Sequence, residues 1–176
     1  QASILQHDSI TGSFQADVSL HDVASWVKRI PAVQSVEVYP SINRHLKVKV
    51  VQRKPHARLH LGDGKEDVYL DRTGRLLPLS PHFTARVPII HAIDSAAAGS
   101  GYHLIRSTEH NPFWAAFIDQ VICGPGQLDV IPRIGRCRIA FGDTTRLDEK
   151  LQNLALFYRE QVARGDLNQY EKISLE

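Results

Sequence analysis

Residues 138–150, RIAFGDTTRLDEK, join an apolar run to a helical pattern through one glycine and three polar residues. A turn of this kind binds phosphate when several glycines expose backbone N–H groups, and in a P-loop a Lys precedes Ser or Thr. Gly142 stands alone, and a carboxylate at Asp143 would repel a phosphate. We therefore predict that Asp143, Thr144 and Thr145 cap the helix that follows.

The nine histidines could ligate a metal, and His56 with His60 is the pair at a familiar ligand spacing. On a helix this spacing brings two imidazoles together, whereas on a strand it separates them by about 13 Å. Residues 57–61, ARLHL, alternate as a strand does, so we predict no metal site.

A catalytic nucleophile would be signalled by a motif such as G-x-S-x-G, and the sequence contains none. We therefore predict no catalytic residue, no cofactor and no small-molecule substrate. An enzyme of unrecognised type is the alternative, and a pocket where Asp, His and a nucleophile converge would indicate it.

The composition is that of a globular protein, with 43% hydrophobic and 23% charged residues over 176 residues. The formal charge of +2 comes from 21 basic and 19 acidic residues mixed along the chain, so we predict no nucleic-acid partner. No window approaches the ~20 consecutive apolar residues that a membrane helix needs.

The two cysteines, Cys123 and Cys137, are too few for a disulfide framework. If residues 118–141 fold as a three-strand meander, the thiols lie on its outer strands. They are then about 9 Å apart, which is too far for a disulfide. We predict buried free thiols.

The elements that would position these residues begin with a helix in VSLHDVASWVKRIP, residues 18–31. Ser19 caps it together with Asp22, Pro31 ends it, and one face is apolar at Leu20, Val23, Ala24, Val27 and Ile30.

Two alternating strands follow, VQSVEVY and LKVKVVQ, at residues 33–39 and 46–52. In the second strand Leu46, Val48 and Val50 would face the helix, while Lys47 and Lys49 point to water. The break at residues 54–55, Lys-Pro, predicts a boundary between a domain of residues 1–54 and one of residues 55–176.

Short strands dominate the second half, in ARLHL, VYLD, RLLPL and VPIIHAI, with the spacing of an antiparallel meander. The small polar stretch at residues 94–102 predicts a surface loop. A short helix capped by Asn111 with Pro112 at its first position then precedes strands in QVICG, LDVIPRI and CRIAFG.

A long helix from Thr145 packs one face on the sheet, through Leu147, Leu151, Leu154, Tyr158 and Val162, and Gly165 ends it. The final strand, YEKISLE, carries Tyr170, Ile173 and Leu175. Its unpaired backbone could accept another chain's strand, although the residues alone favour an interior or protected strand.

Several segments together resemble the FtsQ/DivIB family of bacterial cell-division proteins, in the form found in Bacteroidetes. They are KRIPAVQSVEVYPSINRHLKVKVVQRKPHARL, VYLDRTGRLLPLSP, RVPII and PRIGRCRIAFGDTTRLDEKLQNLALFYREQ with YEKISL. The resemblance runs from about Val23 to Leu175, and the order and intervals of these segments carry it.

The resemblance implies the periplasmic part of a bitopic inner-membrane protein, anchored by a segment outside this chain. It implies a POTRA domain, a following β-domain, no catalytic activity, and a scaffold role in the divisome during septum formation. The implied partners are FtsB/DivIC-like and FtsL-like proteins. A family POTRA domain starts with a strand and a helix, so residues 1–54 are a truncated module without its first strand. Residues 1–10 would be the remnant of its first helix.

In the family a partner adds a β-strand to the last strand of the β-domain, which favours an interaction edge here. The implied partner-binding residues are Tyr170, Lys172, Ile173, Ser174, Leu175 and Glu176. Arg136 and Arg138, with Arg133, would form a rim that binds acidic side chains.

The sequence thus predicts an α+β protein: a truncated POTRA-like module, then a twisted antiparallel β-domain with a long helix packed on its sheet. Its function would be binding. A POTRA-type chaperone module for outer-membrane protein assembly or secretion is the first alternative, although the chain shows no internal repeat. A periplasmic enzyme is the second.

Overall fold

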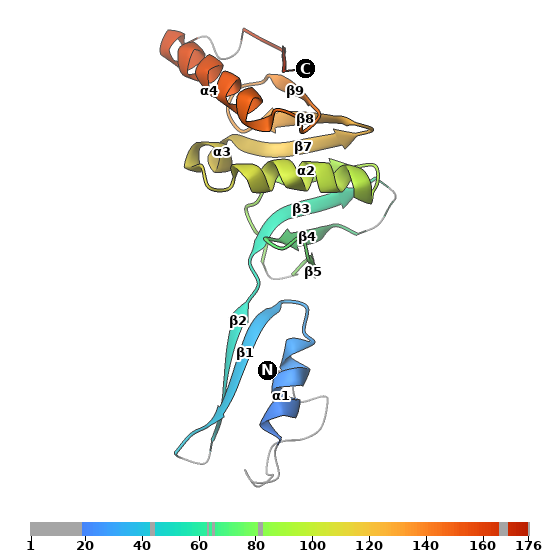
Figure 1. Cartoon of the computed structure of the whole chain (residues 1–176), viewed down its shortest axis with the longest axis vertical. Coiled ribbons are helices and arrows are strands. Elements are labelled where there is room, and N and C mark those ends of the chain that lie inside the picture. Colours follow the sequence, from blue (N-terminus) through green and yellow to red (C-terminus); the bar gives the residue numbers. More distant parts are fainter. Residues whose placement is uncertain are drawn as a thin grey trace. The chain divides into compact units, whose positions relative to one another are not determined.

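The computed structural model describes residues 19–42, 45–62, 64, 66–80, 83–165 and 169–175. The chain divides into two compact units, Gln1–Lys54 and Pro55–Glu176. Both units combine helix and strand, which confirms the α+β class (Figure 1). The helix remnant expected at residues 1–10 lies outside the described residues.

In the first unit, helix α1 (Leu20–Lys28) packs against a hairpin of β1 (Val33–Pro40) and β2 (Leu46–Gln52). Ser19 is the N-cap, and its hydroxyl accepts a hydrogen bond from the Asp22 N–H at 3.3 Å. Val23 and Val27 are buried on the apolar face of the helix. These observations confirm the helix and the hairpin that the sequence predicts.

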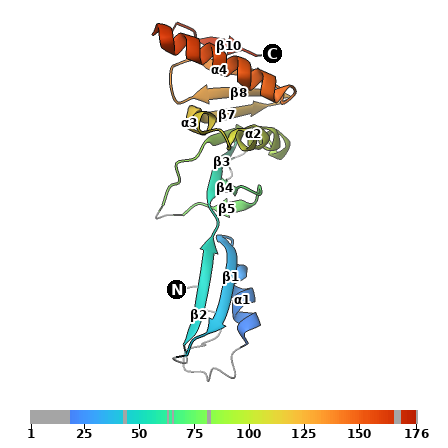
Figure 2. The same cartoon turned by 60° about the vertical axis from the view of Figure 1, so that its left-hand side comes forward.

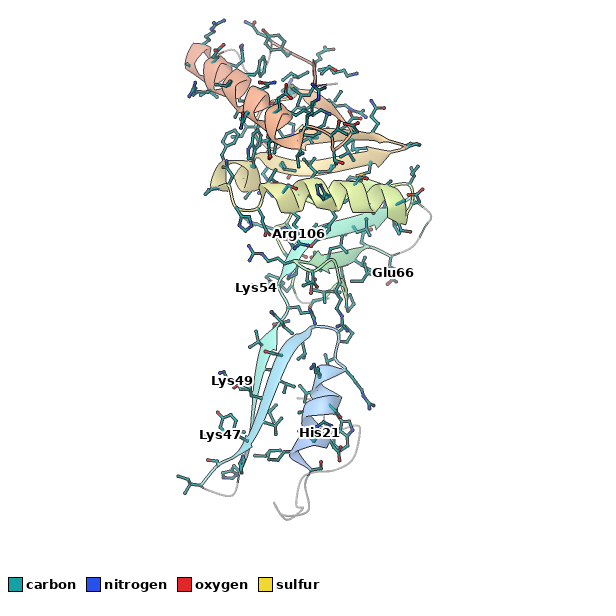
Figure 3. All side chains as sticks on the ribbon, in the orientation of Figure 1. His21, Lys47, Lys49, Lys54, Glu66 and Arg106 are labelled. Atoms are coloured by element: carbon teal, nitrogen blue, oxygen red, sulfur yellow. The ribbon has the colours of Figure 1, made fainter. Side chains whose placement is uncertain are left out.

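The two faces of the hairpin differ in polarity, as the alternation in the sequence predicts. Lys47 and Lys49 lie on the side of β2 away from α1 (Figure 3), and the Lys49 ammonium is 3.3 Å from Glu37 Oε2. Val48 and Val50, on the opposite face, are nevertheless 36% and 45% exposed. The helix therefore leaves part of their surface uncovered, because α1 packs chiefly on β1.

The second unit is built on one eight-stranded sheet in the order β10-β9-β8-β7-β6-β3-β4-β5. Its strands are β3 (Pro55–Leu61), β4 (Val68–Asp71), β5 (Leu76–Pro78), β6 (Ile89–Ala92), β7 (Ile118–Gly124), β8 (Gln127–Pro132), β9 (Arg138–Gly142) and β10 (Lys172–Ser174). Its helices are α2 (Ser95–Thr108), α3 (Pro112–Phe117) and α4 (Leu147–Arg164). Figures 1 and 2 show α2 and α4 against the same face of the sheet.

The core of this unit lies between that face of the sheet and the helices. The strand register aligns one apolar residue from each of six neighbouring strands in a row, namely Leu59, Ile90, Val121, Val130, Ile139 and Ile173. The first five are at most 6% exposed, and Ile173 at the end of the row packs against the same core. The alternation of each strand thus builds one continuous apolar face.

The prediction of an antiparallel sheet is wrong, because the sheet is mixed. β3 pairs with β6, β6 with β7 and β9 with β10 in parallel, while the other neighbours are antiparallel. A helical connection between two strands carries the chain back to the edge where the first strand began, so that the second strand runs parallel to it. α2 and α3 make this connection between β6 and β7, and α4 makes it between β9 and β10.

Helix α2 occupies the stretch for which the sequence predicts a surface loop, and that prediction is therefore wrong. Asp94 caps it, accepting a hydrogen bond from the Ala97 N–H at 2.8 Å. A Cβ at Gly101 would lie 2.4 Å from Cys123 Sγ, so the glycine allows the helix to approach β7 closely. The buried residues recur at helical spacing, as Ala98, Gly101, Leu104, Ile105 and Thr108.

Helix α4 begins at Leu147, later than predicted, and its N-cap Arg146 has φ 49° with no capping side chain. The prediction that residues 143–145 cap the helix is therefore wrong. Asp143 instead closes a turn before the helix, where its Oδ1 accepts hydrogen bonds from the Thr145 N–H and from Lys150 Nζ, each at 3.0 Å. The Thr145 hydroxyl also donates to Oδ1, and this bond, followed by the one from Lys150, is the main reason why the pKa of Asp143 is lowered to about 2.

The buried face of α4 is formed by Leu151, Leu154 and Tyr158, as predicted, and Gly165 ends the helix with φ 77°. Val162 departs from the prediction, because it is 60% exposed and faces a groove between α4 and α3. Among the helices of the described segments, none combines the length and apolar character needed to span a membrane.

Candidate functional site

Strand β10 forms one border of the eight-stranded sheet. It pairs with β9, through Lys172 opposite Arg138 and Ser174 opposite Ala140, and no other strand of the described residues lies beyond it. Helix α4 delivers the chain to this border, since it connects β9 to β10 across the face of the sheet. The border strand is therefore a candidate docking edge.

Hydrogen bonds to β9 show which backbone groups of the border strand are already used. The Arg138 N–H donates to the Glu171 carbonyl, and the Leu175 N–H donates to the Ala140 carbonyl, both at 2.9 Å. In a parallel pair the residues of one strand bond alternately to its two sides. Glu171 and Leu175 therefore face β9, together with Ile173 between them.

The remaining residues of the strand, Lys172 and Ser174, direct their N–H and C=O groups away from β9. Water satisfies these groups at a free border, and a strand from another chain can replace that water. The outer side of β10 thus offers a repeat of two donors and two acceptors.

Side chains of the border strand alternate between the two faces of the sheet. Ile173 and Leu175 are half-buried and pack against the core, whereas Lys172 and Ser174 are exposed on the opposite face. Tyr170, 40% exposed, lies next to the border with its ring 5.3 Å from that of Phe157 on α4. Glu176, the last predicted site residue, lies outside the described residues.

The arginines predicted as an acid-binding rim differ in how they are engaged. Arg138 Nη2 lies 2.5 Å from Oδ2 of Asp129, a largely buried carboxylate on β8. Arg133 Nε lies 3.4 Å from Asp119 Oδ1. Arg136 lies exposed between β8 and β9, and no described residue pairs with it. The guanidinium group of Arg138 therefore already pairs with a carboxylate of the same sheet.

The opposite border of the sheet is β5, and it differs in chemistry from β10. In the pair of β4 and β5, Leu77 is opposite Tyr69. Two residues earlier along the chain from Leu77, the Arg75 carbonyl accepts a hydrogen bond from the Asp71 N–H at 3.0 Å. Alternation in an antiparallel pair then directs Pro78 outward. Because proline has no N–H, this border offers a poorer template for another strand.

The two histidines at ligand spacing lie beside different carboxylates. His56 Nε2 lies 3.2 Å from Glu109 Oε2, and burial lowers the pKa of His56. His60 Nδ1 lies 2.7 Å from Asp67 Oδ1, and this bond is the main reason why the pKa of Asp67 is lowered. Within the described segments, no group of three His, Cys, Asp or Glu residues could hold a metal ion.

The cysteines are both buried and free, which confirms the prediction. Cys137 Sγ lies 3.7 Å from the Tyr158 hydroxyl. Burial raises the pKa of Cys123 to about 11, so that its thiol stays protonated at neutral pH. Neither group therefore has the thiolate character of a reactive cysteine.

Sequence reasoning missed two residues that shape the border. Phe157 supports Tyr170, and its position on α4, one residue before the buried Tyr158, could have indicated it. Asp129 holds Arg138, but the alternation of β8 alone gave no sign of that pairing, since it depends on which strands are neighbours.

A comparison with protein families gives a match over residues 54–176, to the family described as FtsQ/DivIB, C-terminal related. The matched range contains the entire eight-stranded sheet, α2, α3 and α4. No curated protein matches the chain. The chain therefore belongs to the FtsQ/DivIB family, a non-catalytic family of cell-division proteins.

Proposed function

We propose that this chain is the periplasmic part of a bitopic inner-membrane protein that scaffolds the divisome during septum formation. Its membrane anchor lies in a segment outside the chain, and its partners are FtsB/DivIC-like and FtsL-like proteins. Membership of a cell-division family supports this role.

The single observation that carries the mechanism is the one-sided pairing of β10. A partner strand adds beside it and bonds to the outward backbone groups of Lys172 and Ser174. Its apolar side chains contact Ile173 and Leu175, which already pack against the core. Main-chain bonds supply affinity, and Tyr170 and Arg136 contribute to specificity from the adjacent surface.

The two units have separate parts in this proposal. Residues 1–54 form a POTRA-like module, for which the order α1, β1, β2 corresponds to the second helix and the last two strands of a POTRA domain. Residues 55–176 form the β-domain that carries the docking edge.

The test is a proline at Ser174 in the full-length membrane protein. Ser174→Pro removes an outward N–H and places a ring where the partner strand would lie, while the bonds to β9 are retained. We expect capture of the periplasmic parts of FtsB-like and FtsL-like proteins to fall at least about tenfold.

The matched control is Ser174→Ala, which keeps the outward N–H and should bind as the unchanged protein does. The thermal unfolding midpoint of both variants, compared with that of the unchanged protein, separates loss of docking from loss of fold. Equal capture by the proline and alanine variants, with the fold intact, would rule out strand addition at β10.

A further inference from the structure

A second surface of the β-domain, separate from the β10 border, is a groove between α3 and α4. Its volume is about 400 Å³. The groove is lined by Phe113, Phe117, Ile134, Tyr158, Arg159 and Val162. Apart from one arginine these are apolar or aromatic residues, which is the composition of an interaction surface.

The groove has a buried floor and exposed walls. Phe117 and Tyr158 form the floor, being 3% and 5% exposed, with their rings edge to face at 4.6 Å. Phe113, Ile134 and Val162 form the walls, with 46%, 58% and 60% of their surfaces exposed. Covering these exposed apolar side chains with a partner is favourable, because it removes their apolar surface from water.

Three arginines lie in or beside the groove. Arg159 lines the groove itself, and Arg133 and Arg136 flank Ile134 in the loop between β8 and β9. Arg133 pairs with Asp119, but within the described part of the chain neither Arg136 nor Arg159 has an ion-pair partner. Free guanidinium groups beside an apolar recess complement carboxylates beside an apolar stripe.

We propose that this groove binds an amphipathic helix of a partner protein, with carboxylates beside its apolar stripe. Apolar side chains at i, i+3 or i+4, and i+7 would enter the recess between α3 and α4 as a third helix. An anionic membrane fits less well, because a flat bilayer would contact Val162 and Ile134 but not the recessed Phe117 and Tyr158.

The probe is a designed helical peptide of about 18 residues, long enough for a stable amphipathic helix, with a leucine stripe flanked by glutamates. Its counterpart carries lysines in place of the glutamates. We expect fluorescence anisotropy to show at least about tenfold tighter binding of the acidic peptide. Val162→Glu should weaken that binding by a similar factor, since it puts a charge on the wall of the groove.

The matched control is Leu156→Glu. Leu156 is 49% exposed on α4 and does not line the groove, so this variant should bind the acidic peptide normally. Arg159→Gln should reduce the preference for the acidic peptide over the basic one. Ser174→Pro should leave peptide binding unchanged, which separates this groove from the β10 border.

Three results would overturn the proposal. The first is equal binding of the two peptides, and the second is equal effects of Val162→Glu and Leu156→Glu. The third is failure of the unchanged protein to bind the acidic peptide, combined with a different interaction that Val162→Glu abolishes. That interaction would be binding to phosphatidylglycerol vesicles, or self-association measured by sedimentation. That last outcome would assign the groove to a membrane or to a second copy of the chain.

Discussion

The ammonium group of Lys150 donates a hydrogen bond to the carboxylate of Asp143 at 3.0 Å, and further bonds at the same distance to two backbone carbonyls, those of Phe141 and Asp143. Lys150 is 6% exposed, although lysine is rarely buried. The three bonds tie the first turn of α4 to the end of β9. These bonds hold to the sheet the helix that leads to the candidate docking edge at β10.

Replacing Lys150 with Met should destabilise the β-domain by about 2 kcal/mol, because buried carbonyl groups lose their donor. Urea unfolding followed by fluorescence measures this change. Glu149→Met, one residue away and exposed, is the control and should change the free energy of unfolding by less than about 0.5 kcal/mol. Similar effects of the two substitutions would contradict a specific role for the lysine.

The carboxylate of Asp143 should make stability depend on pH in acid. Its pKa is lowered to about 2 from an ordinary 3.8, by hydrogen bonds from Thr145 and then Lys150. Because the folded pKa is the lower one, the stabilisation is complete above the ordinary value and is lost as the pH falls toward 2. The difference in urea midpoint between the unchanged protein and Asp143→Asn should therefore shrink between about pH 4 and pH 2.

Gly101 should not tolerate a side chain, because an added Cβ would lie 2.4 Å from Cys123 Sγ. We expect Gly101→Ala to destabilise the domain by about 2 kcal/mol. Gly99→Ala on the same helix meets no atom within 4 Å and should stabilise it by up to about 1 kcal/mol. Combining Gly101→Ala with Cys123→Ala should recover much of the loss, and a failure to recover would place the clash elsewhere.

The two cysteines should react slowly with thiol reagents at pH 8 in the folded protein. Both are buried, and burial raises both pKa values, that of Cys123 to about 11. Absorbance after addition of a disulfide reagent should show two thiols released only when urea unfolds the β-domain. Fast modification of the folded protein would show that one thiol is exposed.

Elements that carry their own pattern could be predicted from the sequence. α1 has a cap at Ser19, an apolar face and a proline stop, and its hairpin alternates over both strands. The strands of residues 118–142 form the predicted three-strand meander, with Cys123 on β7 and Cys137 one residue before β9. In each case the pattern lies within the segment itself, so the element can be predicted without knowing which distant segments pack against it.

The fold departs from the prediction where the conformation of a segment depends on packing against distant strands. The stretch at Ser95–Thr108 has the small polar residues of a loop, yet Gly101 and Ala98 are what allow α2 to lie close on β7 and β6. Without this helix the neighbouring strands read as a meander, and the parallel pairing of β6 with β7 follows from it. The missed helix therefore accounts for the error at β6 and β7, whereas the parallel pairs of β3 with β6 and of β9 with β10 arise elsewhere in the chain.

At the candidate site, too, local features could be predicted from the sequence and features that depend on packing could not. Alternation in residues 170–175 predicts a strand and the inward side chains of Ile173 and Leu175. The place of that strand in the sheet depends on α4 and β9, and so does the engagement of Arg138 by Asp129. The groove between α3 and α4 left no sign in the sequence, because its walls come from three separate segments.

The proline at one end of the sheet limits how neighbouring molecules can associate. Two copies could in principle join β10 of one to β5 of the next, a head-to-tail contact that does not close and would grow into an open fibre. Pro78 presents a ring where such a contact needs a donor. Head-to-tail growth of the sheet from one copy to the next is therefore disfavoured at the β5 border.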